Sequence, residues 1–327
     1  MVAMTAIVLF DVFGLLIGTL FGFFGMGGSF LVTPALLVMG FRSEVAVGSG
    51  LAFVFGTSVI GALRHRGLGQ VDYKLAVLMV IGITPGIEAG KHVIQFLGNQ
   101  GTLDLFISVA YVGLLAVVGL ITLRDAMTDD TKEDDASRGI AGRLQTVRIP
   151  PMISLNGGST ISLWIVIATG FGIGVLSGIL GVGGGFLLMP AMMFGFGVPA
   201  AVAVGTSILQ ITLSGAYGAF TYAQSGFVNV PVVAGLLGGS ALGASIGAAA
   251  TDLVDEADIK IYFAAMLLAG SLAVASRNLS STYGIEALHT VSIVLIFGSA
   301  LLVSGAVVVS AVQELRASGS GHVTNPS

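Results

Sequence analysis

The sequence contains no cysteine and few charged residues. Without cysteine, the chain has no disulfide, no thiolate metal site and no cysteine nucleophile. Charged residues make up 9% of the 327 residues, whereas a soluble domain carries roughly 25%. So few charges cannot cover the surface of a soluble globule of this apolar content. A soluble enzyme, a disordered protein and a nucleic-acid-binding protein are therefore excluded.

The chain is instead rich in long apolar stretches. Hydrophobic residues make up 55% of the chain, and the mean hydropathy is +0.99. The apolar runs are continuous rather than short and alternating, which favours membrane-spanning helices over a β-barrel. Since a crossing takes about 20 apolar residues, the sequence predicts an all-α integral membrane protein, a polytopic helical bundle of about 8–11 crossings.

One polar stretch divides the chain. Residues 124–159 hold 11 of the 30 charged residues (13 basic plus 17 acidic), as well as Pro150-Pro151, a composition typical of a linker. We expect a first membrane repeat over residues 1–124, a charged cytoplasmic linker over 125–159, a second membrane repeat with the last helix over 160–313, and a flexible tail over 314–327.

The two hydrophobic halves repeat each other. The segment GMGGSFL from Gly25 aligns with GVGGGFL from Gly181 at an offset of 156, and AVGS from Ala46 aligns with AVGT from Ala203 at 157. Internal duplication is typical of secondary transporters. Cations follow the second apolar run of the first half but not its counterpart, which favours two inverted, pseudo-symmetric repeats. A parallel duplication with four crossings per half remains an alternative.

Each glycine cluster lies in an apolar run that is too long for one helix and too short for two, and Pro34 or Pro190 follows it. Glycine permits positive φ and close approach of other groups. A helix that restarts after such a break exposes free N–H groups and the positive end of its dipole, which together suit an anion. The alternative is close helix packing alone, but two clusters in register favour glycine-broken helices.

These patterns predict a substrate-binding set. Backbone donors are expected at Gly25, Gly27, Gly28, Ser29, Gly181, Gly183, Gly184 and Gly185. Side-chain ligands are expected at Ser49, Thr206, Ser207 and Gln210. Thr57 and Ser214 form another equivalent pair, which either faces the same ligand or back-bonds to its own helix.

Ionisable residues inside apolar runs are expensive and often functional. Asp11 lies in the first run; Glu88, Lys91 and His92 lie together in the third, at helical spacing on one face. They are candidates for proton coupling. The alternative is that Lys91 and His92 extend to the membrane edge with Glu88 as their partner.

Other motifs are missing. The chain has no H-E-x-x-H segment and no P-loop, and its glycine runs do not follow a strand as a dinucleotide site requires. Four scattered histidines do not indicate a transition-metal path. We therefore expect no enzyme activity, no cofactor and no metal.

The paired glycine segments resemble the signature of the TauE/SafE sulfite exporter family, of the 4-toluene sulfonate uptake permease type. Gly22–Pro34 reads GFFGMGGSFLVTP and Gly178–Pro190 reads GILGVGGGFLLMP, and the likeness covers residues 5–310. Leu242, which stands where the first half has Pro85, and the long linker depart from the pattern.

The resemblance implies a permease of the cell inner (cytoplasmic) membrane for a small anion such as sulfite, sulfoacetate or a related organosulfonate. It also implies secondary transport coupled to a proton or ion gradient. Expected partners are the anion and the lipid bilayer, with a homodimer as a candidate assembly and no nucleic acid. A permease for another small solute, or a non-transporting scaffold or sensor subunit, remains the alternative.

Overall fold

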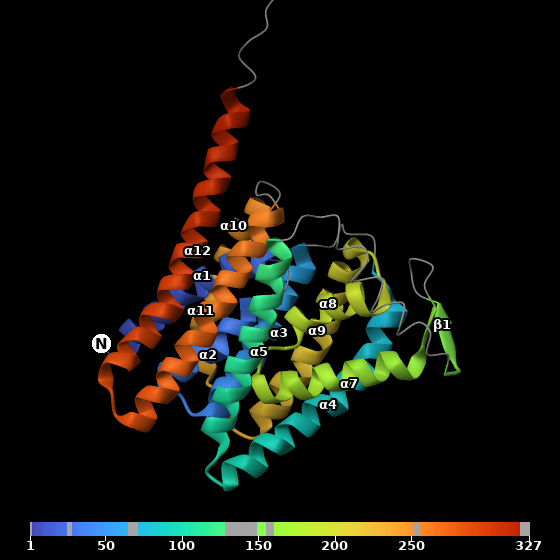
Figure 1. The fold of residues 1–327 in the computed structure, drawn as a ribbon, viewed down its shortest axis with the longest axis horizontal. Helices are drawn as coiled ribbons and strands as arrows, with labels where there is room; N and C mark the ends of the chain where they lie inside the picture. The colour runs from blue at the N-terminus through green and yellow to red at the C-terminus, as the bar shows by residue number, and fades with distance from the viewer. Residues whose placement is uncertain are drawn as a thin grey trace, which may run out of the picture.

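The computed structural model describes residues 2–24, 28–64, 71–127, 149–154, 160–251 and 256–320. Within these ranges the fold is all-α apart from one small hairpin (Figure 1). The first half contains α1 (Val2–Phe24), the 3-10 turn η1 (Gly28–Leu31), α2 (Val32–Val38), α3 (Ser43–Arg64), α4 (Tyr73–Asn99) and α5 (Leu103–Ala126). The second half contains α7 (Leu163–Leu180), α8 (Gly185–Pro190), the π-helical η3 (Ala191–Gly195), α9 (Ala200–Gln224), α10 (Val230–Thr251), α11 (Glu256–Tyr283) and α12 (Glu286–Ser320).

The predicted linker is only partly described. Residues 128–148 and 155–159 lie outside the described ranges. The strands β1 (Met152–Ser154) and β2 (Thr160–Ser162) stand on either side of residues 155–159 and pair antiparallel. The predicted tail begins inside α12, which continues to Ser320.

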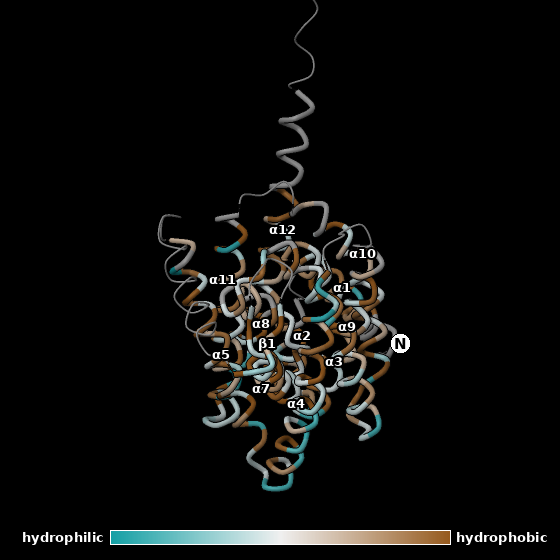
Figure 2. Tube along the Cα trace, turned by 90° about the vertical axis from the view of Figure 1, so that its right-hand side faces the viewer, coloured by the Kyte–Doolittle hydropathy of each residue, from teal (hydrophilic) through white to brown (hydrophobic). Residues whose placement is uncertain are grey.

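Seven of the described helices are long and apolar enough to cross a membrane: α3, α4, α5, α7, α10, α11 and α12. In α1 the apolar stretch Val8–Phe24 is shorter. Apolar residues run through most of the helices in Figure 2, and hydrophilic ones gather mainly near the turns. The predicted helical, multi-pass membrane class is confirmed, and the range of 8–11 crossings stays a prediction.

Two helix pairs pack closely, and both join the two halves. α1 lies along α10, and α4 lies along α7 (Figure 1). Three glycines of α10 and three of α4 face the partner backbone: Gly239, Gly243, Gly247, Gly82, Gly86 and Gly90. A Cβ at any of these would overlap a carbonyl oxygen of the partner helix. Small residues thus allow these backbones to approach closely, as is common in membranes.

The centre of the bundle is formed by α3 and α9. Gly215 of α9 faces Phe55 of α3, and Gly218 faces Leu51, so the two helices cross in opposite directions. Outside them, α11 packs between α5 and α12. The second glycine motif lies inside this arrangement, against α3.

Candidate functional site

The second glycine motif breaks a helix, as the sequence predicts. α7 ends at Leu180, and the chain passes through left-handed conformations at Gly181, Gly183 and Gly184, with φ of 72°, 68° and 76°. α8 then begins at Gly185 and ends at Pro190. Residues with a Cβ adopt this left-handed conformation only with strain, so the glycines are what permit the break.

The turn rests directly on α3. A Cβ at Gly181 would meet the backbone of Val47, and a Cβ at Gly183 would overlap the side chain of Val54. The glycines therefore serve a second purpose, since they bring the broken helix into contact with the central helix.

The corresponding motif of the first half is only partly described. α1 ends at Phe24 and the chain resumes helical structure at Gly28. The predicted residues Gly25 and Gly27 lie outside the described residues, as does the side chain of Ser29. What is visible is a helix that stops and a short helix, α2, that follows.

The open carbonyl end of α7 is satisfied by two tyrosines from other helices. Tyr222 of α9 donates to the carbonyl oxygen of Gly178 at 2.6 Å, and Tyr111 of α5 donates to that of Leu180. Both tyrosines are fully buried. Because an unpaired carbonyl is costly in an apolar interior, these bonds stabilise the break. We did not single out either tyrosine from the sequence, where a tyrosine in an apolar run carries no distinctive signal.

Ser49 and Thr206 form matching bonds between the halves. The hydroxyl of Ser49 accepts the N–H of Asn229 at 2.9 Å, and that of Thr206 accepts the N–H of Asp72 at 3.0 Å. Asp72 and Asn229 precede α4 and α10, and each side chain accepts an N–H from the first turn that follows. Both pairs obey the offset of 157. The sequence predicted the hydroxyls, but not that each would contact the other half.

The other predicted polar residues of α9 lie on one face of the helix. Ser207, Gln210 and Ser214 are all buried. The hydroxyls of Ser214 and Thr57 donate to carbonyls of their own helices, which is the back-bonding alternative. Neither the amide nitrogen nor the amide oxygen of Gln210 has a hydrogen-bond partner among the described residues.

The ionisable cluster of α4 faces α9. Lys91 is buried, and its ammonium donates to the carbonyl of Thr221 at 3.0 Å. Glu88 accepts from the hydroxyl of Tyr217 at 3.1 Å and lies 3.7 Å from the ring of His92. His92 is mostly exposed and fits the membrane-edge alternative, whereas Lys91 turns inward.

Asp11 lies elsewhere, at the contact between α1 and α10. A Cβ at Gly238 would come within 3.0 Å of its carboxylate. The four candidates for proton coupling therefore do not form one group.

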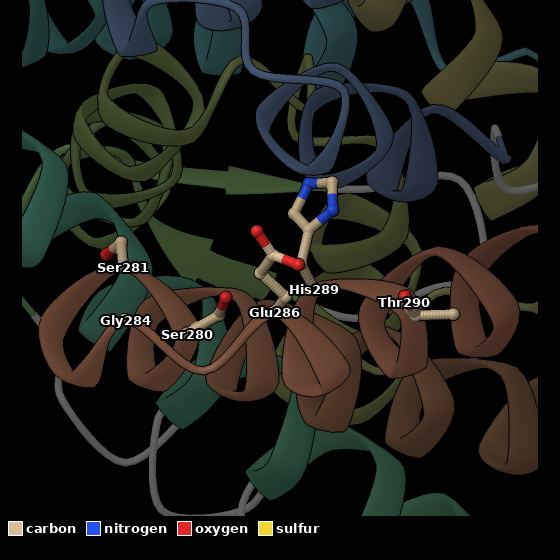
Figure 3. A pocket seen from close by; sticks show the side chains of 6 residues that line it. All are labelled: Ser280, Ser281, Gly284, Glu286, His289 and Thr290. Atoms are coloured by element: carbon tan, nitrogen blue, oxygen red, sulfur yellow. The ribbon is translucent and has the colours of Figure 1, made fainter.

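A separate hollow of about 590 Å³ opens at the turn between α11 and α12. It is lined by Ser280, Ser281, Gly284, Glu286, His289 and Thr290 (Figure 3). In Figure 3 the side chains of Glu286 and His289 point to the same side of α12, and the ring of His289 lies 3.3 Å from the carbonyl of Val38. None of those predicted substrate-binding residues that the structure describes lines this hollow.

Comparison with known proteins adds a family. The model described as sulfite exporter TauE/SafE matches residues 12–274. A "Probable membrane transporter protein YunE" of Bacillus subtilis is 29% identical over 250 residues, which cover 74% of this chain and 87% of the relative. A "Probable membrane transporter protein" of Xylella fastidiosa is 30% identical over 237 residues, with 72% and 80% covered.

A plant relative is matched over a shorter part. The "Sulfite exporter TauE/SafE family protein 2" of Arabidopsis thaliana is 27% identical over 146 residues, which cover 43% of this chain and 30% of the relative. No solved structure matches.

Proposed function

Because the chain belongs to the sulfite exporter TauE/SafE family, we propose that it moves a small anion across the cytoplasmic membrane by alternating access. The class itself is established, since the chain is a multi-pass membrane protein of a transporter family and not an enzyme. The proposal adds the cargo, which is sulfite, sulfoacetate or a related organosulfonate, and the coupling of its movement to a proton or ion gradient.

One observation carries the choice of an anion. At the break in the second half, side chains bond the carbonyl end of α7, whereas no side chain caps the amide end of α8. Tyr111 and Tyr222 bond the carbonyl end of α7. The amide end of α8 begins at Gly184, which has no side chain to cap it, and the N–H groups of Leu187 and Leu188 donate to the Gly184 carbonyl oxygen. The earlier amide of Gly185 precedes these bonds, and such groups suit an anion.

The proposed site extends this end with the predicted side chains. The hydroxyls of Ser49 and Thr206 each accept one backbone N–H, which leaves the hydroxyl proton for a ligand. Gln210 and Ser207 lie further along the buried face of α9. By the sequence offset of 156, Gly25, Gly27, Gly28 and Ser29 correspond to Gly181, Gly183, Gly184 and Gly185, and we propose them as the matching ligands of the first half.

The packing supports inverted repeats and suggests which parts move. The offset relates α1 to α7 and α4 to α10, so the close pairs α1–α10 and α4–α7 are counterparts. Each pair takes one helix from each half. A sequence half therefore cannot move as one body without separating glycine contacts, and the moving units are the two crossed pairs.

Proton coupling is assigned first to Glu88, with Asp11, Lys91 and His92 as the further candidates. The carboxylate of Glu88 lies between the Tyr217 hydroxyl of α9 and the exposed ring of His92. It thus joins the partly buried contact of α4 and α9 to a group that reaches the surface, as a proton path requires.

Flux of sulfite and of sulfoacetate into proteoliposomes of purified protein tests the function, with and without an imposed pH gradient. Gradient-dependent flux of either anion is expected. Absence of flux for both, in vesicles whose protein is shown to be folded, contradicts the proposal.

A further inference from the structure

Gln210 is the most unusual polar side chain among the described residues. It is completely buried near the middle of α9, and neither end of its amide is bonded to any of the described residues. A buried polar group without a partner costs about 1–3 kcal/mol, and native proteins leave few such groups. The amide of Gln210 has two N–H donors and one carbonyl acceptor, and their burial without partners among the described residues indicates that a ligand binds there.

The helix that carries this amide packs against the elements around the glycine turn, α3 and α8. Ile211, the next residue, belongs to the same buried cluster as Val54 and Leu188. The side chain of Val54 contacts Gly183 of the turn, and Leu188 belongs to α8. Ser207 and Ser214 flank Gln210 along the same face of α9, about one turn before and after it.

Among the described residues, the ionised groups along this face of α9 carry no surplus of positive charge. Asp72 bonds to Thr206, one turn before Gln210, and Glu88 bonds to Tyr217, about two turns after it. The described cation on this face is Lys91, which bonds to the carbonyl of Thr221 about three turns away. An anion beside Gln210 is therefore held by neutral donors. Since the cost of desolvating an ion rises with the square of its charge, a dianion is strongly disfavoured there.

We infer that the amide of Gln210 binds the transported anion and restricts transport to singly charged oxyanions, such as hydrogensulfite or a simple alkylsulfonate. The inference rests on the proposed function and narrows its substrate class. The N–H groups of the amide donate to the anion's oxygens, and its carbonyl accepts the O–H of a protonated anion or of an accompanying water. Of the cargo proposed above, the inference keeps hydrogensulfite and simple alkylsulfonates. It makes sulfoacetate a poor substrate, because sulfoacetate carries two charges, as sulfate does.

The test uses purified full-length protein with methanesulfonate as the monoanion and sulfate as the dianion. Thermal unfolding measures binding, and proteoliposome flux measures transport. Gln210→Leu should leave the unliganded melting temperature equal or raise it, because the unpaired amide is removed. Its methanesulfonate affinity should fall at least about tenfold, the loss expected for one or two hydrogen bonds to a charged ligand. Gln224→Leu is the matched control, since Gln224 is exposed at the end of the same helix.

Each outcome decides a separate claim. Methanesulfonate binding at the wild-type affinity in Gln210→Leu overturns the role of the amide. If the leucine variant does not fold, Gln210→Met decides the same point, because methionine is closer to glutamine in length. Equal wild-type flux of sulfate and methanesulfonate overturns the charge selectivity while the proposed function stands. Failure of wild-type protein to move any anion overturns both the inference and the proposed function.

Discussion

The hydroxyl of Thr206 in α9 accepts the backbone N–H of Asp72, the residue directly before α4, at 3.0 Å. The two residues are 134 positions apart and belong to different halves. Ser49 and Asn229 make the counterpart bond in the opposite sense at 2.9 Å. Two hydrogen bonds thus join the halves. One connects α9 to the residue before α4, and the other connects α3 to the residue before α10.

Thr206→Val removes this hydroxyl and keeps the shape of the side chain. The buried N–H of Asp72 then loses its acceptor, and we expect the protein to lose about 1–3 kcal/mol of stability. The midpoint of thermal unfolding in detergent measures the effect. Thr212→Val is the control, because the Thr212 hydroxyl only back-bonds to Ile208 in the same helix. Equal midpoints for both variants would show that the bond between the halves adds no stability.

Tyr222→Phe removes the donor to the carbonyl of Gly178 while the ring stays in place. The carbonyl is left unpaired at the end of α7, so stability should fall by about 1–3 kcal/mol, and anion flux should fall because the break is no longer held. Tyr73→Phe, at an exposed position at the start of α4, should change neither quantity. Wild-type flux and stability in Tyr222→Phe would contradict the role given to this tyrosine.

Gly183→Ala and Gly226→Ala separate two effects of glycine. Both residues have positive φ, 68° and 73°, but a Cβ at Gly183 would overlap Val54, whereas none of the described groups lies within 4 Å of a Cβ at Gly226. The Gly226 variant should lose only the strain of the left-handed conformation, about 1–2 kcal/mol. The Gly183 variant should lose more and should transport poorly. Thermal midpoints and flux measured side by side check this, and equal losses would mean that the contact with α3 is unimportant.

Glu88→Gln tests proton coupling without removing the bond to Tyr217, because an amide oxygen still accepts from the hydroxyl. Flux driven by a pH gradient should fall to the level seen without a gradient, while exchange of anion for anion continues. Glu44→Gln, near the start of α3 and paired with Arg42, should behave as wild type. Full gradient dependence in Glu88→Gln would assign coupling to another group.

Much of this protein is readable from its composition and its internal repeat. The scarcity of charge determines the membrane class, and the pairing of glycine clusters predicts a break of the kind now seen between Leu180 and Gly185. These features are local, because a glycine's conformational freedom and the apolar length of a helix depend on neighbouring residues only.

The tertiary structure decided what the predicted residues contact. No spacing rule joins Tyr222 to Gly178, or Thr206 to Asp72, because these bonds depend on how distant helices cross. The same crossing turns Lys91 inward, to the carbonyl of Thr221 near the end of α9. From the sequence alone, Lys91 could equally have extended to the membrane edge. The crossing also buries the amide of Gln210, which has no hydrogen-bond partner in the described part of the chain. A sequence specifies which groups must find partners in an apolar medium, and only the packed bundle determines which groups those partners are.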